Sequence, residues 1–143
     1  MKVQKRTASV RRILIAMLLF FGIITLFLSS SILLDLFGIR EREGNYVQFV
    51  VLANFFASIF YLVGAGGLIA GRAWARYPLW MASLVLLLAS VAFGWYISQG
   101  GIHEQRTIGA MVFRTLLTIA FYATAVWIGR VQHQPSNTNT QNT

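Results

Sequence analysis

Three polar residues interrupt or border the long apolar stretches of this sequence: Asp35, Asn54 and Arg114. Counted at a rise of 1.5 Å per residue, Asn54 lies roughly 12 Å and Arg114 roughly 10 Å inside the ends of the helices that would carry them. Asp35 closes another apolar stretch near the same level. A charge at the helix centre costs about 2.5–3.5 kcal/mol on insertion scales and usually faces a bundle interior or a partner. We therefore expect a polar cluster in one leaflet of a membrane, either as a ligand site or as a structural contact.

Three roles are open for Arg114. Its side chain could snorkel to the membrane surface, because helical side chains tilt toward the helix N-terminus. It could instead form an ion pair with Asp35 or a hydrogen bond with Asn54. The third role is a substrate or ion site. The two structural roles together are favoured over the ligand site, because each satisfies the guanidinium without a further molecule.

Small and polar residues also recur at helical spacing. Gly64, Gly67 and Gly71 permit close backbone approach between helices, and the last two form a G-x-x-x-G motif. We expect these glycines to pack helices within the chain, with a homodimer contact as the alternative. Each of the last three expected helices has one stripe of polar or small residues at a spacing that favours helix packing. In chain order, the stripes are Asn54, Ser58 and Tyr61, then Ser83, Ser90 and Gly94, and finally Arg114, Thr118 and Tyr122.

The sequence offers few groups for catalysis or for cofactor binding. It has no Cys, which excludes thiol chemistry and cysteine-ligated metals. Its two histidines, His103 and His133, lie outside the apolar stretches, whereas a membrane haem needs axial ligands within the spans. His103 and Glu104 alone cannot complete a closed zinc site. Because a Ser-His-Asp set and paired intramembrane carboxylates are missing as well, we expect no enzyme activity, no cofactor and no metal.

The amino-acid composition indicates whether these apolar segments are surrounded by water or by lipid. Of the 143 residues 57% are hydrophobic and 11% are charged, whereas soluble domains carry about 25% charged residues. This excludes an ordinary soluble globule and predicts an integral membrane protein surrounded by lipid. The net charge of +8 comes from basic residues that flank the apolar stretches, as membrane topology requires. Binding to nucleic acid is therefore not expected.

Four spans are predicted, over about 13–35, 46–70, 77–98 and 107–129, in an all-α antiparallel up-down-up-down bundle. The first span is too long for the apolar region of a cleaved signal peptide and lacks a cleavage site, so we expect it to be retained. The fourth is short, because its uncharged part, 115–129, would reach only about 22 Å as a helix. Extending it back to Thr107 gives a full span that contains Arg114. The alternative is a re-entrant fourth segment, which would place the two termini on opposite sides.

The distribution of Lys and Arg predicts the orientation. Eight basic residues lie in 1–12, in 71–76 and just after the fourth span, against three in the other two loops. By the positive-inside rule, both termini are cytoplasmic. Trp and Tyr residues gather at the expected span ends, as an aromatic belt does. We interpret 1–12 as a basic cytoplasmic N-terminus and 131–143 as a disordered cytoplasmic tail, since the tail has almost nothing to bury.

Two segments carry a family resemblance. LLDLFGIREREGNYV (33–47) and GGIHEQRTIGAMVFR (100–114) resemble segments of a group of small uncharacterised bacterial four-span integral membrane proteins, whose shape is similar to that of DoxX-like proteins. The resemblance implies the same fold, a location in the bacterial inner membrane and a functional outer face, and it carries no activity. The size also resembles that of small multidrug exporters, but those need a glutamate in the first span, and 13–34 contains no acid.

Two functions are consistent with these features. The leading hypothesis is a non-enzymatic accessory subunit of a larger membrane system, in contact with lipid and with a larger membrane protein or a second copy of itself. The alternative is a component of a small transporter or channel, with a solute or ion site near Asp35, Asn54 and Arg114.

Overall fold

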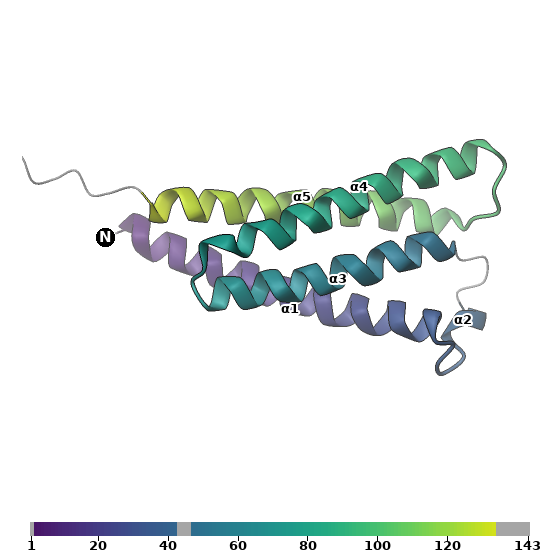
Figure 1. Ribbon diagram of the computed structural model, residues 1–143, viewed down its shortest axis with the longest axis horizontal. Helices are drawn as coiled ribbons and strands as arrows, with labels where there is room; N and C mark the ends of the chain where they lie inside the picture. The colour runs from purple at the N-terminus through teal and green to yellow at the C-terminus, as the bar shows by residue number, and fades with distance from the viewer. Residues whose placement is uncertain (1, 43–46, 134–143) are drawn as a thin grey trace, which may run out of the picture.

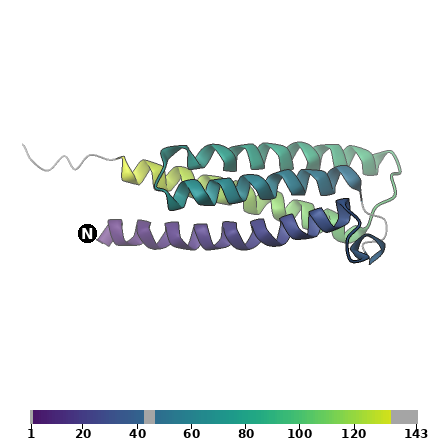
Figure 2. The same cartoon turned by 60° about the horizontal axis from the view of Figure 1, so that its bottom comes forward.

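The computed structural model describes residues 2–42 and 47–133. Within these ranges four long helices, α1 (Lys2–Leu33), α3 (Gln48–Ile69), α4 (Arg76–Ser98) and α5 (Gln105–Gln132), form an antiparallel bundle in which consecutive helices pack side by side (Figures 1 and 2). Two short helices, α2 (Ile39–Arg42) and η1 (Ala73–Ala75), lie in the connections. The prediction of an all-α up-down-up-down bundle is confirmed. The loop acid Glu43, Tyr46 and most of the expected tail lie outside the described residues.

Each of the four long helices is long and apolar enough to cross a membrane. The fourth is one continuous helix that extends along the bundle, so Arg114 lies within it, nine residues after its start. The structure therefore has a continuous fourth helix in place of a short re-entrant segment. Because the number of long helices is even, the start of α1 and the end of α5 lie at the same end of the bundle (Figure 1). We refer to this as the terminal end, and to the opposite end, where α1 ends and α5 begins, as the pocket end.

The first helix begins much earlier than the apolar stretch. It starts at Lys2, so the basic segment expected as a separate N-terminus forms the first three turns of α1. Lys, Arg and Gln are good helix formers, and no Gly or Pro interrupts 2–21. Thr7 in this extension is buried, and Val10 packs against the core. Hydropathy alone marks where a helix enters lipid, and the hydrogen-bonded backbone continues beyond that point.

The interior of the bundle is narrow, and its surface is apolar. Leu18, Leu79 and Leu86 are almost fully buried at the contacts between helices. By contrast, Phe20, Leu88 and Trp95 are 61%, 61% and 70% exposed. Large apolar side chains around the whole circumference are what a lipid-facing surface requires and what a water-soluble bundle avoids. The structure thus agrees with the composition in describing a multi-pass membrane protein.

The three glycines predicted to pack helices have two different structural roles. A Cβ at Gly64 would lie 2.9 Å from Leu79 Cδ2, and one at Gly67 would lie 2.9 Å from Ala75 Cβ. Both glycines therefore allow α3 to approach α4 and η1 closely within the chain. Gly71 does not take part in this packing, contrary to the prediction. It lies beyond the end of α3 with φ +64°, where it makes the left-handed turn toward η1.

Candidate functional site

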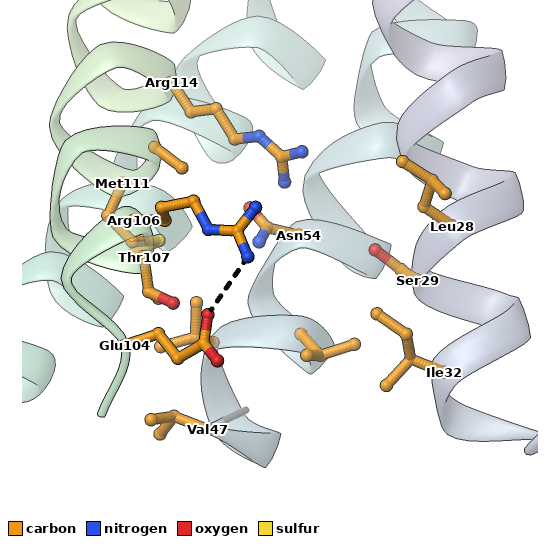
Figure 3. A pocket seen from close by; sticks show the side chains of 13 residues that line it. Leu28, Ser29, Ile32, Val47, Asn54, Glu104, Arg106, Thr107, Met111 and Arg114 are labelled. Carbon is orange, nitrogen blue, oxygen red and sulfur yellow. Dashed lines mark ion pairs between the residues drawn. The ribbon is translucent and has the colours of Figure 1, made fainter. Parts of the chain in front are cut away.

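A pocket of about 260 Å³ opens at the pocket end of the bundle. Three helices form its walls, and Figure 3 shows α5 and α1 on opposite sides with α3 between them. The residues that line it come from α1 (Leu28, Ser29 and Ile32), from α3 and the residue before it (Val47, Val50, Val51 and Asn54), and from α5 and the residue before it (Glu104, Arg106, Thr107, Ala110, Met111 and Arg114). Charged, amide, hydroxyl and apolar groups thus share one cavity.

The pocket exists because α1 and α5 pack together over only part of their length. These two helices contact each other much less than consecutive helices do, and they diverge toward the pocket end (Figure 1). Deeper in the bundle, the rings of Phe21 and Phe121 lie 6.2 Å apart, and Tyr61 packs edge-on against Phe121 at 6.1 Å. These three aromatic side chains fill the space between the helices below the pocket.

Arg114 extends from α5 across the pocket toward α1 (Figure 3). The backbone of Arg114 is fixed by a hydrogen bond from the next turn of α5, in which the Thr118 hydroxyl donates to the Arg114 carbonyl oxygen at 2.6 Å. The Tyr61 hydroxyl in turn donates to Thr118 Oγ1 and so connects this turn of α5 to α3. In addition, Ser90 of α4 hydrogen-bonds Thr115 at 2.9 Å. The predicted stripes of α3 and α5 therefore meet at Tyr61 and Thr118, whereas Ser90 meets Thr115, which lies outside the predicted stripe of α5.

Asn54 lies beside Arg114 in the pocket and is only 9% exposed. Among the residues that the structure describes, its side-chain oxygen has no hydrogen-bond partner. A buried polar atom left in this state costs about 1–3 kcal/mol, so such atoms in proteins usually have a partner. The Asn54 oxygen is therefore a buried acceptor that still lacks a donor, in a residue that lines the pocket.

The mouth of the pocket carries an ion pair that the sequence analysis did not assign to the site. Arg106 lies 3.7 Å from Glu104, with side chains 90% and 34% exposed (Figure 3). An exposed pair of this kind contributes at most about 1 kcal/mol to stability. The pair matters for the charge of the pocket, since in the described part of the chain two guanidinium groups and one carboxylate line it. The close spacing of these residues before a predicted span was the only signal in the sequence.

Of the three residues predicted to form the polar cluster, the structure brings Asn54 and Arg114 into one pocket and leaves Asp35 outside its lining. Helix α1 ends at Leu33, and Asp35 occupies an exposed turn with φ +54°. The sequence-based argument used depth alone, and depth does not give the direction in which a residue beyond a helix end faces. Within the described residues, the acidic member of the lining is Glu104.

His103, the other polar residue considered at this end, is held by local contacts. Its Nδ1 lies 2.8 Å from the carbonyl oxygen of Gly101, and its ring packs edge-on against Phe93 at 6.0 Å. In the described part of the chain, no three His, Cys, Asp or Glu side chains come together as a metal site would require. These contacts assign His103 to the structure of the loop between α4 and α5.

Comparisons with protein-family models, with curated proteins and with solved structures find no match for this chain. The resemblance noted from 33–47 and 100–114 therefore stays a prediction. The pocket and its chemistry carry the functional argument.

Proposed function

We propose that this chain is a multi-pass protein of the bacterial inner membrane that binds a small anion in the pocket, as the solute-binding part of a transport system. The observation that carries the proposal is the meeting of Arg114 and Asn54 in one cavity. An ionisable residue at this depth is costly to insert, and such residues commonly mark substrate or ion pathways. A guanidinium that lines a pocket attracts an anion and donates charge-assisted hydrogen bonds to it.

The charge of the pocket favours an anion over a cation. Among the lining residues that the structure describes, Arg106 and Arg114 outnumber the one carboxylate, that of Glu104. A guanidinium presents a planar fork of donors that matches a carboxylate or a phosphate group. The hydroxyls of Ser29 and Thr107 add neutral hydrogen-bonding groups on opposite walls (Figure 3). This set of groups suits an oxyanion of a few heavy atoms.

The proposed orientation places the pocket at the periplasmic face. Basic residues are concentrated at the terminal end, where the positive-inside rule favours the cytoplasm. An anion would then enter from outside. The aromatic packing of Phe21, Tyr61 and Phe121 lies between the pocket and the cytoplasmic half of the bundle. For a transport component, this packing corresponds to the closed barrier that must open for an anion to cross.

The test is anion-dependent stabilisation of the purified protein in mild detergent. Thermal unfolding is followed in chloride buffer with added inorganic phosphate, sulfate or acetate, at constant ionic strength. A ligand at a hundred times its Kd stabilises the native state by about 2.7 kcal/mol, which gives a clear rise in Tm. We expect at least one oxyanion to raise the Tm of the unaltered chain and not that of Arg114→Gln.

Arg72→Gln is the matched control, because it removes the same charge from an exposed position near the terminal end. It should retain the stabilisation. Equal shifts in the unaltered chain and in Arg114→Gln would show a general salt effect and contradict the proposal. Stable copurification of a larger membrane protein, without any anion-dependent shift, would instead favour the accessory-subunit hypothesis.

A further inference from the structure

We propose that the occupant of this pocket is the headgroup of an anionic phospholipid, a phosphodiester that carries a hydroxyl group, with an acyl chain leaving between α1 and α5. The inference rests on the proposed anion site and specifies its ligand. Three observations carry it: the mixed lining of the pocket, its opening between two helices, and the unpartnered oxygen of Asn54.

The lining is divided between polar and apolar groups. Arg114, Asn54 and Thr107 provide charge and hydrogen bonds, whereas Leu28 and Met111 belong to an apolar wall completed by the valines at the start of α3. A fully hydrated inorganic ion would lose water against that wall and gain nothing from it. An amphiphile satisfies both parts, because its apolar portion is removed from contact with water while its headgroup meets the polar groups.

The pocket is accessible from the side of the bundle as well as from its end. Leu28 on α1 lines the cavity and is also 37% exposed on the surface, and Ala110 on α5 lines it and is exposed. These residues form the two rims of the gap between the diverging helices. Because the gap faces the lipid-exposed surface, a lipid can place its headgroup in the pocket while its chains stay in the bilayer.

The hydrogen-bonding groups indicate the type of headgroup. A guanidinium such as that of Arg114 donates charge-assisted hydrogen bonds to phosphodiester oxygens. The Asn54 oxygen needs a donor, which a phosphodiester lacks and a hydroxyl on the headgroup provides. The described lining residues carry an excess of one positive charge, which favours a headgroup with net negative charge over a zwitterionic one. A glycerol-type headgroup meets all three conditions.

The same chemistry occurs in a free glycerol phosphate, so the experiment must separate the two sources. The full chain in detergent is titrated with phosphatidylglycerol, with phosphatidylcholine, and with sn-glycerol 3-phosphate. Bound lipid is counted by native mass spectrometry, and stabilisation is followed by thermal unfolding. We expect phosphatidylglycerol to bind at least about tenfold more tightly than phosphatidylcholine, as one charge-assisted hydrogen-bond pair would provide.

Two pairs of variants test the residues. Arg114→Gln should abolish the preference for phosphatidylglycerol, and Arg72→Gln should keep it. Ala110→Phe narrows the gap between α1 and α5 and should weaken lipid binding at least about tenfold. Ala123→Phe adds the same ring at an exposed position of α5 away from the pocket and should have no effect.

The outcomes distinguish this inference from the function on which it rests. If sn-glycerol 3-phosphate stabilises the protein as strongly as the lipid and Ala110→Phe has no effect, the ligand is a water-soluble anion. The lipid inference is then overturned, while the anion site stands. If no anionic species distinguishes the unaltered chain from Arg114→Gln, both proposals are overturned.

Discussion

At the scale of single residues, the site depends on a chain of hydroxyl groups beneath it. Tyr61 donates to Thr118, and Thr118 donates to the carbonyl oxygen of Arg114. Neither hydroxyl lines the pocket, yet together they join α3 to the turn of α5 that carries the guanidinium. Tyr61 and Thr118 are therefore positioning residues for Arg114.

The two hydroxyls should differ in what their removal costs. In Tyr61→Phe, Thr118 still donates to the Arg114 carbonyl, so we expect a loss of about 0.6 kcal/mol in the free energy of unfolding, the average for interhelical hydrogen bonds in membranes. Thr118→Val leaves the buried Tyr61 hydroxyl without its acceptor and should cost about 1–3 kcal/mol. Unfolding in mild detergent with increasing SDS measures both losses.

The double variant should cost less than the sum of the single variants, because the two hydroxyls interact directly. Thr124→Val is the control, since the Thr124 hydroxyl bonds only the backbone one turn earlier on the same helix, at Ala120. Strictly additive losses, or a loss in Thr124→Val as large as in Thr118→Val, would show that the contact between α3 and α5 contributes nothing.

The placement of Asp35 leads to a second prediction at this scale. Asp35 lies outside the pocket lining, so Asp35→Asn should leave the anion-dependent rise in Tm unchanged, whereas Arg114→Gln should remove it. Asn is the appropriate replacement because it tolerates the left-handed backbone found there. The coupling of the two substitutions in unfolding tests the predicted pair between Asp35 and Arg114. Additivity within about 0.5 kcal/mol would contradict the pair, and a larger coupling would support it.

The candidate site was only partly predictable from the sequence, for a geometric reason. Arg114 was located because 115–129 is too short to span a membrane, and Asn54 because it lies at a similar depth. Depth follows from helix rise and needs no knowledge of neighbours. Whether Glu104 and Arg106 line the pocket depends on the angle between α5 and α1, and this angle cannot be derived from the sequence.

At the scale of helices, neighbouring glycines of α3 offer a matched comparison. A Cβ at Gly67 would lie 2.9 Å from Ala75 Cβ and 3.1 Å from its Cα, whereas a Cβ at Gly66 meets nothing within 4 Å. Gly66→Ala should be neutral or stabilising by up to about 1 kcal/mol through helix propensity. Gly67→Ala should destabilise by about 1–3 kcal/mol, because η1 must move away.

Unfolding in detergent measures both substitutions, and Gly66→Ala controls for the change in backbone entropy. Equal effects would mean that α3 and η1 do not approach as closely as the structure places them. A loss confined to Gly66→Ala, together with a change in oligomeric state, would indicate that the exposed Gly66 forms a contact between two copies of the chain.

The sequence predicted that each long helix exists, but it predicted the helix ends less accurately. Long uncharged stretches identified three of the long helices, because only a helix satisfies its backbone groups in lipid. The fourth was predicted by extending the short uncharged stretch 115–129 back through Arg114 to Thr107. The start of α1 at Lys2 was missed because hydropathy reports burial in lipid and not hydrogen bonding. Gly71 was misassigned because a G-x-x-x-G spacing does not reveal that the helix has already ended at Ile69.

At the scale of the whole molecule, the topology can be tested directly. An even number of antiparallel spans puts both termini on one side, and the charge distribution predicts that this side is the cytoplasm. A fusion of alkaline phosphatase after Val131 should be inactive, and one inserted between Gly100 and Arg106 should be active. A fluorescent protein at the same positions should give the opposite pattern. Active phosphatase after Val131 would contradict the orientation and would place the pocket in the cytoplasmic leaflet.

The length of α1 gives the molecule a mechanical property. Its 32 residues form a single rod of about 48 Å that leans on α5 near Phe21. From that contact, the rod extends roughly 16 Å to Ile32 at the pocket and roughly 28 Å to Lys2. The two arms of α1 on either side of that contact are therefore unequal. If α1 tilted as a rigid rod about it, widening the pocket by about 1 Å would move the basic tip by about 1.7 Å in the opposite direction, which is a displacement of positive charge at the other end of the bundle.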